Sequence, residues 1–544
     1  MKLTRLFSLV LIVALIGMFA SCSKPDQHLN TIPSTAQLVS SVDLLTVAKK
    51  AELYDLDQYA FYGEMMKKLQ EENPDMHAYM KEIISNPLKT GLRYREDVYF
   101  FAEDLNKNPH MGMTMSLRND GDFETFLTNM LEKSKSEATI IKKEGLNYLT
   151  EKSMLLAYDA DKMLMVIHEQ SNEEELFGYV KTLMNQTGES AIVSHSDFSK
   201  FKDKKEDFNL WVASDAIPQT PQTAMLQSQI PFKTSGNNLH AHINFKDEGI
   251  FGSAKWSFND EIKAILEDYE FSRNFNTELL AYLPKESYVT LGFGMNPEAI
   301  YKYLNDIPSY KKMLDQANKN APLSIEQVVN SLGGDIIITM HGFMLPEPAE
   351  TESPGSTNQN VLPYASAIFS MNNSEVYDKV TNEMLPKGLF TKTDDYYAGN
   401  FNGFDVFFGL FDNNLIVTND KAVIEEAANG GMEENVGDTE LAKLYNHSVF
   451  MYMNMDWEKY PAPLKDMMAK NMGNKELEQF QSITNYTREM RFYEESLGNG
   501  KMEMLMKNTD GNALHTILQM VDENRPQTDK KDKQEDEIAE AIED

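Results

Sequence analysis

The stretch FETFLTNML, Phe123 to Leu131, follows the strand-like residues MSLRN, Met115 to Asn119. The same succession returns later in the chain as FSMNN, Phe369 to Asn373, and VYDKVTNEML, Val376 to Leu385. In both places a short apolar strand ends at a polar turn and an amphipathic helix begins. The repeated unit indicates that two parts of the chain share one fold.

Three further matches accompany this one, and they occur in the same order in both parts of the chain. They pair Ile32–Leu53 with Leu283–Leu304, Ser196–Pro218 with Asp438–Pro461, and His240–Leu266 with Arg488–Val521. Four ordered matches predict an internal duplication, with halves at residues 32–278 and 279–523. Each copy is far longer than a solenoid repeat, so we expect two tandem related domains.

Within each half the expected strands are short and the expected turns are polar. Asp159-Ala160-Asp161 and Asp412-Asn413-Asn414 are typical of hairpin turns. Asp122 and Ser374 are predicted to cap the helices of the repeated unit. Mostly antiparallel sheets covered by helices follow from this order of elements, which places the chain in the α+β class.

Two stretches depart from the repeat. Residues 345–362, LPEPAETESPGSTNQNVL, form an insertion rich in Pro, Glu, Ser and Thr, which predicts a mobile loop. Residues 524–544 are highly charged and contain no aromatic residue, which predicts a disordered tail.

The N-terminus carries a short basic head and an apolar run that extends to Phe19. The run is too short for a transmembrane helix and is typical of a signal peptide, residues 1–21. It ends in Phe19-Ala20-Ser21-Cys22, which resembles the lipobox of bacterial lipoproteins. The resemblance implies lipidation of Cys22, the only cysteine in the chain. Residues 22–31 are then expected to be a polar tether between the membrane and the folded body.

The residues after Cys22 bear on the location of the protein. Ser23 is not the Asp that implies retention in the inner membrane, so the resemblance to lipoproteins implies the outer membrane. An acidic cluster of the kind found in surface-exposed lipoproteins is missing, because only Asp26 stands there, beside Lys24. We therefore expect the periplasmic face, with the lipid anchor as the contact to the membrane.

The charge balance excludes one class of partner. The chain carries 84 acidic and 51 basic residues, a formal charge of −33. Nucleic acids and anionic lipid surfaces are bound through basic patches, which this composition disfavours. A hydrophobic content of 42% nevertheless predicts a folded protein rather than a disordered one.

Motifs for common enzyme classes are missing from the sequence. It contains no His-Glu-x-x-His pair, no Walker loop, no Gly-x-Ser-x-Gly elbow and no complete calcium loop. No cofactor is therefore predicted, and an enzymatic role is not favoured. A carboxylate pair for hydrolysis of an envelope glycan or peptide is an alternative, because the many acids supply candidate pairs whose separation the sequence does not reveal.

Methionine is frequent, with 33 copies, and it often alternates along expected strands. Met111, Met113 and Met115 form one such set, and similar sets occur at 163–165, 451–455 and 502–506. Alternation places the thioethers on one face of a strand, where they suit either a hydrophobic core or a soft ion such as Cu(I). Packing is the favoured interpretation, and copper handling is a weaker alternative.

The lipobox, the chain length and the duplicated body together resemble the Bacteroidetes lipoproteins grouped as domain of unknown function 4836. The resemblance covers nearly the whole mature chain and implies no established activity. Our hypothesis is a non-enzymatic envelope lipoprotein that binds or scaffolds an envelope protein or glycan through a groove or face between its halves.

Overall fold

The computed structural model describes residues 27–216, 220, 231–344, 361–386, 388–401, 404–507 and 511–523. The predicted signal peptide, Cys22, the first part of the tether, nearly all of the insertion and the charged tail therefore lie outside the described residues. The predicted α+β class is confirmed, because helices accompany a large antiparallel sheet.

Within the described part of the chain, twenty strands form the sheet, and every pairing between them is antiparallel. The strands in the first half of the chain are β1 (Leu38–Val42), β2 (Val98–Glu103), β3 (His110–Ser116), β4 (Ile141–Lys143), β5 (Leu146–Glu151), β6 (Met154–Tyr158), β7 (Lys162–Ile167), β8 (Phe208–Ala213), β9 (Asn238–Lys246) and β10 (Gly249–Ser257). The strands in the second half are β11 (Val289–Gly294), β12 (Leu332–Met344), β13 (Leu362–Met371), β14 (Phe390–Lys392), β15 (Tyr397–Phe401), β16 (Phe404–Phe411), β17 (Asn414–Thr418), β18 (Val449–Asn454), β19 (Thr487–Ser496) and β20 (Asn499–Met506).

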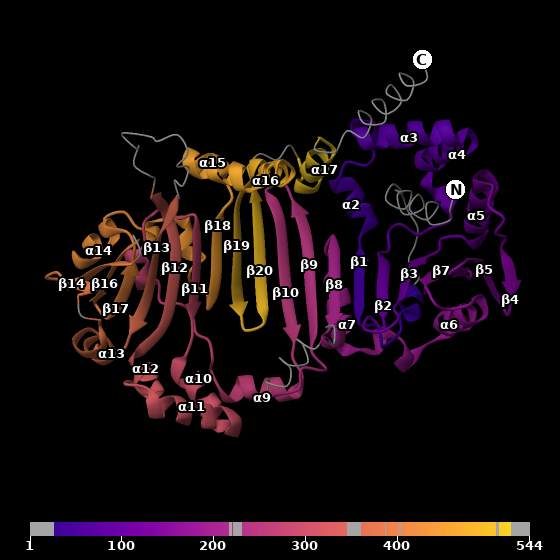
Figure 1. The fold of residues 1–544 in the computed structure, drawn as a ribbon. Helices are drawn as coiled ribbons and strands as arrows, with labels where there is room; N and C mark the ends of the chain where they lie inside the picture. Colours follow the sequence, from indigo (N-terminus) through magenta and orange to yellow (C-terminus); the bar gives the residue numbers. More distant parts are fainter. Residues whose placement is uncertain are drawn as a thin grey trace, which may run out of the picture.

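The pairings give one unbroken order of strands across the molecule (Figure 1). In the first half the order is β4-β5-β6-β7-β3-β2-β1-β8-β9-β10. In the second half it is β14-β15-β16-β17-β13-β12-β11-β18-β19-β20. The connectivity of one half is thus the connectivity of the other.

The last strands of the two halves pair with each other, and we call this junction the seam. β10 and β20 are antiparallel, in register from Gly249 opposite Leu505 to Lys255 opposite Asn499. The expected boundary at 278/279 therefore does not separate two sheets, because backbone hydrogen bonds continue from one half into the other. The two halves meet edge to edge along the seam.

The helices are short to medium in length, and several begin at side-chain caps. They are α2 (Leu44–Lys50), α3 (Ala60–Glu72), α4 (Pro74–Ser85), α5 (Asp120–Ser134), α6 (Glu173–Asn185), α7 (Ser196–Asp203), α9 (Asp260–Asp268), α10 (Pro297–Asp306), α11 (Pro308–Asn320), α12 (Ile325–Ser331), α13 (Glu375–Lys379), α14 (Lys421–Ala428), α15 (Ala462–Asn471), α16 (Asn474–Tyr486) and α17 (Ala513–Glu523).

The predicted caps of the repeated unit are wrong in detail. α5 begins at Asp120, and Asn119 is its cap, because the Asn119 side chain accepts a hydrogen bond from the Asp122 backbone N–H at 2.8 Å. Ser374 does precede α13, but its side chain makes no capping bond to the helix backbone and instead donates to the Asp378 carboxylate. In the first half, the cap is therefore Asn119, the Asx residue nearest to the end of the strand, and not the later Asp122.

Both predicted hairpin turns are confirmed. Asp159 to Asp161 connects β6 with β7, and Asp412 and Asn413 connect β16 with β17. Asp412 and Asn413 have positive φ angles of 46° and 61°, the left-handed conformation that a tight two-residue hairpin turn requires.

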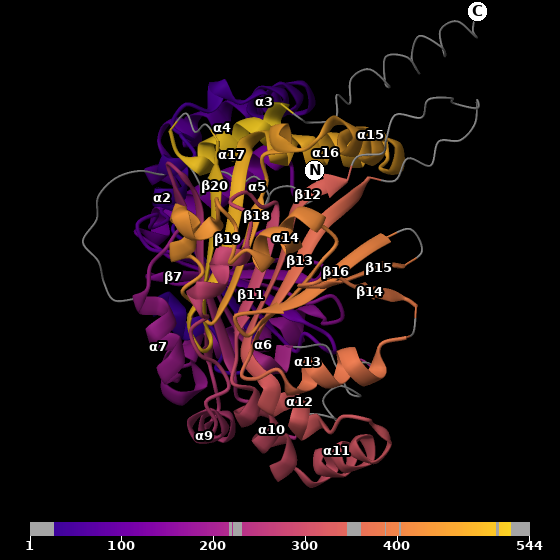
Figure 2. The same ribbon diagram turned by 90° about the vertical axis from the view of Figure 1, so that its left-hand side faces the viewer.

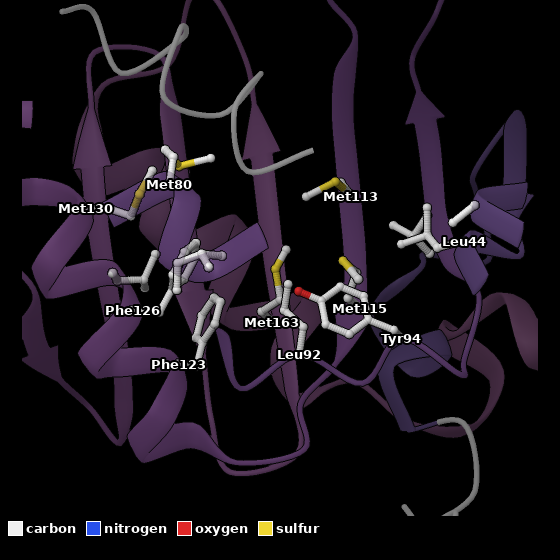
Figure 3. Close-up of a cluster of buried hydrophobic side chains, with 14 of the residues drawn as sticks. Leu44, Met80, Leu92, Tyr94, Met113, Met115, Phe123, Phe126, Met130 and Met163 are labelled. Atoms are coloured by element: carbon white, nitrogen blue, oxygen red, sulfur yellow. The ribbon is translucent and has the colours of Figure 1, made fainter. Parts of the chain in front are cut away.

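Helices cover both faces of the first half of the sheet. On one face, α2 to α5 bury a core that includes Met113, Met115, Phe123 and Phe126 (Figure 3). On the other face, α6 and α7 pack over a second core that includes Trp211. The first half is therefore a three-layer arrangement of helices, sheet and helices.

The second half is covered differently. One face packs against α14 and short 3₁₀ helices, in a core that includes Ile337, Ile416 and Phe450. On the opposite face, α15 and α16 lie along one set of strand ends and α9 to α12 along the other (Figures 1 and 2). Among the described helices, none crosses the middle of β11, β12 and β13 in Figure 1.

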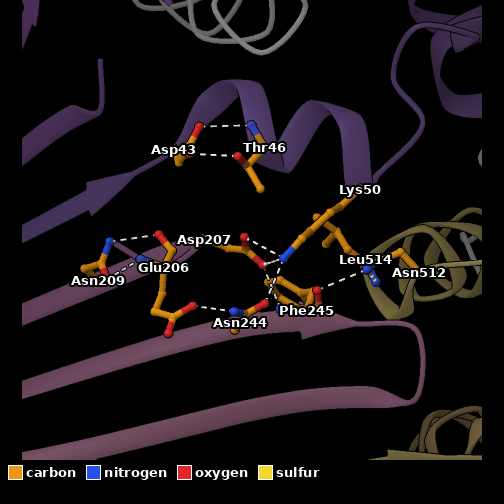
Figure 4. A network of polar contacts seen from close by, with 10 residues as sticks. All are labelled: Asp43, Thr46, Lys50, Glu206, Asp207, Asn209, Asn244, Phe245, Asn512 and Leu514. Atoms are coloured by element: carbon orange, nitrogen blue, oxygen red, sulfur yellow. Dashed lines mark hydrogen bonds and ion pairs between the residues drawn. The ribbon is translucent and has the colours of Figure 1, made fainter. Parts of the chain in front are cut away.

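The C-terminal helix α17 ties the halves together. It packs on the first half of the molecule, where His515 Nδ1 lies 2.9 Å from the Tyr59 hydroxyl. Next to it, the Lys50 ammonium binds the buried Asp207 carboxylate at 2.7 and 2.8 Å and the Asn244 amide oxygen at 2.8 Å (Figure 4). Asn512 donates to the Phe245 carbonyl at 3.0 Å, so this network joins α2, β9 and the residues leading into α17.

The folded body begins earlier than expected. Gln27–Thr31, the end of the predicted tether, forms a 3₁₀ helix in which His28, Leu29 and Thr31 are buried. Leu29 belongs to the same core as Trp211, so these residues are held by apolar burial. The expected tether can therefore comprise only residues 22–26.

Candidate functional site

The uncovered side of the second half carries three rows of apolar side chains. Alternate residues of a strand point to the same face, so the strand register defines each row. The first row runs Met502, Phe492, Met451, Leu291, Ile338, Ala367, Val417, Phe408. The second runs Met504, Met490, Met453, Val289, Met340, Ala365. The third runs Val449, Phe293, Ile336, Phe369, Leu415, Leu410.

We call these twenty residues the open face. None of them is charged, and none is buried. Ile338 is 45% exposed and Phe492 is 37% exposed, although both lie on interior strands of the sheet. The alternate residues of the same strands, such as Ile337, Thr339 and Phe450, are almost completely buried. The sheet therefore has a filled core on one side and an apolar surface in contact with solvent on the other.

The first half has no such surface in the corresponding place. There the row Leu149, Leu156, Met165, Met113 continues across β5, β6, β7 and β3. Leu149, Leu156 and Met113 are only 2%, 1% and 4% exposed, because α3 to α5 cover them. The three rows therefore lie in the second half, and the first row continues across the seam through Gly252 to Ile243, which is 36% exposed.

The helices beside the open face bury their apolar sides only in part, and Tyr303 of α10, for example, packs against Tyr269 and Phe271. α10 contains Ile300, Tyr303 and Leu304, yet none of its residues is buried. In the first half, α5 buries six residues, whereas α13, which occupies the same place in the chain order, buries none. Contiguous exposed apolar surface of this kind marks an interaction site in a stable protein.

The structure separates the methionines that the sequence singles out. Met113 and Met115 are 4% and 3% exposed and pack among aliphatic and aromatic side chains, while Met111 is 48% exposed. The predicted trio is therefore divided between core and surface. The later methionines behave differently, since Met453, Met490 and Met504 are neighbours in one row of the open face.

The carboxylates near the seam form hydrogen bonds or ion pairs with neighbouring side chains. Glu503 accepts from the Tyr493 hydroxyl at 3.1 Å and lies 3.5 Å from Arg491. Glu206 accepts a hydrogen bond from the Asn244 amide. Among the described residues, no group of three or more His, Cys, Asp and Glu side chains could hold a metal ion. Cys22, the predicted lipidation site, lies outside the described residues.

The sequence contained a signal for the open face that the prediction did not use. β12, β17 and β18 contain the runs IIITM, LIV and VFMYM, which lack polar alternation. A strand of this kind is apolar on both faces and needs cover on both. The prediction placed helices on one face of each sheet and did not conclude that the other face of these strands would be an exposed apolar surface.

A family model described as a domain of unknown function, DUF4836, matches residues 28–514. The chain belongs to the DUF4836 family. No curated protein matches the chain. The DUF4836 body also contains, within its described residues, no helix that is long and apolar enough to pass through a membrane.

Solved structures of TP0453 share a distant likeness with this DUF4836 chain. Crystal form IV is 12% identical, with a TM-score of 0.24, and the match covers 44% of this chain and 84% of that one. Crystal form I is 10% identical, with a TM-score of 0.23, and the match covers 47% and 90%. These scores are too low to support a conclusion about fold or function.

Proposed function

We propose that this protein is a non-enzymatic, lipid-anchored protein of the bacterial envelope that holds the acyl chain of an apolar ligand on its open face. Cys22 would carry the anchor, in the outer membrane and on its periplasmic side. The observation that supports the ligand class is the uncharged row across eight neighbouring strands, from Met502 to Phe408, in which no side chain is buried.

Acyl chains suit this surface better than glycans do. The three rows contain no charged group and no hydroxyl or amide side chain, so a sugar placed there would lose its hydrogen bonds to water without replacement. An acyl chain loses no such bonds and gains about 25 cal/mol for each Å² of apolar surface removed from water. The strand ends are flanked by α15 and α16 on one side and by α9 to α12 on the other, so the apolar rows run between two sets of helices (Figure 2).

Methionine makes the surface adaptable. Met340, Met451, Met453, Met490 and Met502 all lie on the open face, and several are neighbours in the strand register. Unbranched thioether side chains repack around ligands of different shape, as they do on other promiscuous binding surfaces. This composition supports recognition of chain-like ligands that vary in length or unsaturation.

The experiment is a titration of the full-length protein with a fluorescent fatty acid, cis-parinaric acid. Ile338→Glu and Phe492→Glu place a carboxylate in the centre of the open face, and we expect each to weaken binding at least tenfold, because the charge must lose water when a chain covers it. Leu497→Glu is the matched control. Leu497 is 43% exposed, close to the 45% of Ile338, but it lies in the turn between β19 and β20.

Equal affinity of the wild type and the two open-face variants would refute the proposal, and so would the lack of saturable binding by the wild type. Weakening by Leu497→Glu to the same extent would also count against it, because the effect would then come from added charge alone.

Copper handling is a second candidate, and one observation favours it. Met490 lies between Met453 and Met504 in the register, so three thioethers share one row on an accessible surface. Thioethers are ligands for Cu(I). Titration with Cu(I) in competition with bicinchoninate separates the two functions, since Met490→Leu would abolish copper binding and preserve an apolar surface for acyl chains.

We also propose that the two halves arose by internal duplication and that only one copy retained an open face. The shared strand order of the two halves supports this history. The first copy would then be the structural support, closed by α2 to α5, and the second copy the binding half.

A further inference from the structure

A second candidate site lies on the opposite side of the sheet, at the seam. On β20, Met502 and Met504 belong to the open face, so Lys501 and Glu503 point to the other side. There, a pocket of about 350 Å³ is formed by β9, β10, β19, β20 and the C-terminal end of α7. Both halves of the molecule contribute to its walls.

The walls of this seam pocket are basic, although the chain as a whole is strongly acidic. Lys200, Lys204, Lys255 and Lys501 line the pocket, against one carboxylate, Glu495. Glu495 lies 3.6 Å from Lys501, and Lys200 pairs with Asp197 at 3.2 Å. The chain has a formal charge of −33, so four ammonium groups around one pocket are a local concentration of positive charge.

Two of the lysines are held close to each other. The Lys204 ammonium donates to the Ser253 hydroxyl at 2.5 Å, and Ser253 is the register partner of Lys501 across the seam. Partial burial lowers the pKa of Lys204, and the positive charge of Lys501 lowers it further. The nearby Glu206 and Glu495 carboxylates raise this pKa but have smaller effects. An anion bound between the two ammonium groups would reduce their repulsion.

A buried imidazole completes the pocket. His240 lines it and is only 4% exposed, and its Nε2 is buried without a hydrogen-bond partner among the described residues. A buried polar atom without a partner costs roughly 1–3 kcal/mol, so such atoms in stable proteins generally serve a ligand or a water. The unsatisfied nitrogen is a second feature of this pocket wall, independent of the lysine charges.

We propose that the seam pocket binds a phosphate group, either free or as the monoester of a small sugar. Lysine ammonium groups are point charges that bind phosphate oxygens without a fixed geometry, and the His240 imidazole can supply a further donor. The volume exceeds that of a lone phosphate, which leaves room for a sugar. Because the pocket is local and the surrounding protein acidic, an extended polyanion such as nucleic acid does not fit.

The test is calorimetric titration of the full-length protein with inorganic phosphate and, separately, with glucosamine 6-phosphate, at ionic strength held constant with chloride. We expect saturable binding of at least one probe, with tighter binding of the sugar phosphate if a monoester is the ligand. The double variant Lys204→Met/Lys501→Met, which keeps the chain length but removes both charges, should bind at least tenfold more weakly.

Lys311→Met/Lys312→Met is the matched control, because these adjacent lysines are exposed on α11, away from the pocket. It should bind both probes like the wild type. His240→Phe keeps the ring and removes the nitrogens, and it should weaken binding without preventing folding, which circular dichroism would verify. The proposal is overturned if neither probe binds saturably to the wild type, or if the lysine double variant binds as tightly as the control.

Discussion

His242, a neighbour of the seam pocket, shows how local hydrogen bonds fix the state of a single residue. The Asn209 amide group donates to the Ser41 hydroxyl at 3.1 Å and to the Glu206 carbonyl at 3.0 Å, so the Asn209 Oδ1 must be an acceptor. His242 Nδ1 lies 2.8 Å from that oxygen and therefore carries the proton. Burial, and then the nearby Lys204 charge, lower the pKa of His242 to about 4.

This shift predicts a pH dependence of stability. In the unfolded chain a histidine has a pKa of about 6.5, so between pH 6.5 and 4 the unfolded state binds a proton that the folded state does not. The stability that this pKa shift contributes is therefore fully present above pH 6.5, and it is lost as the pH falls toward 4. We expect a loss of about 1 kcal/mol between pH 7 and pH 5, below the full value for the shift because the pocket is solvated.

Urea unfolding of the wild type and of His242→Gln over this pH range measures the effect. The difference between their free energies of unfolding should shrink as the pH is lowered. A difference that does not change with pH would show that His242 does not titrate as the structure implies.

At the residue scale the sequence predicted packing better than sites. Alternation with small or polar residues favoured a core position for Met111, Met113 and Met115, which is confirmed for Met113 and Met115 and wrong for Met111. His240, Lys204 and Lys501 were not predicted, because they are brought together only when β9, β10 and β20 are paired, and Lys204 and Lys501 lie far apart in sequence.

At the scale of elements, α17 supplies a cap that α3 lacks. Tyr59 precedes α3 and offers no side-chain cap. Instead, the Asp522 carboxylate of α17 accepts hydrogen bonds from the backbone N–H groups of Ala60 at 2.6 Å and Phe61 at 2.8 Å. A carboxylate at a helix N-terminus satisfies free N–H groups and interacts favourably with the helix dipole.

Asp522→Ala is therefore expected to lower the free energy of unfolding by about 1 kcal/mol, the usual contribution of an N-cap. Native-state hydrogen exchange should show the loss first at the Ala60 and Phe61 amides. Asp466→Ala, which removes an exposed carboxylate on α15, is the control and should change stability by less than about 0.5 kcal/mol. Unchanged protection of the two amides in Asp522→Ala would contradict the capping role.

The individual helices and strands were largely predictable from the sequence, but the faces of the sheet that the helices cover were not. Hairpins such as β16–β17 have both alternating residues and turn residues, so their positions followed from local sequence. The positions of the helices on the second half of the sheet did not follow from local sequence. α10, for example, is amphipathic and could equally have packed on the centre of the sheet. Its placement at the strand ends depends on tertiary contacts that periodicity does not encode.

At the scale of the whole molecule, the seam makes the two halves one structure. Two domains that share no backbone hydrogen bonds can unfold independently of each other. The observed sheet is continuous through β10 and β20, and α17 from the end of the chain packs on the first half. The sequence could not reveal this arrangement, since nothing in β10 or β20 distinguishes a strand at a free edge from one at a seam.

Continuity predicts one cooperative unfolding transition. Differential scanning calorimetry of the full-length protein should show a single peak whose calorimetric and van't Hoff enthalpies agree. Two resolved peaks, or a calorimetric enthalpy about twice the van't Hoff value, would mean that the halves unfold separately and that the seam contributes little.

The open face is the central claim, and photoaffinity labelling tests it most directly. A fatty acid that carries a diazirine on its chain would be mixed with the full-length protein and activated by light. Mass spectrometry of the digested protein would then identify the labelled peptides. We predict labels on β11, β12, β18 and β19, at or beside Leu291, Ile338, Met451 and Phe492, which excess unlabelled fatty acid prevents. Labels on the first half alone, or labels that excess fatty acid does not reduce, would contradict the account.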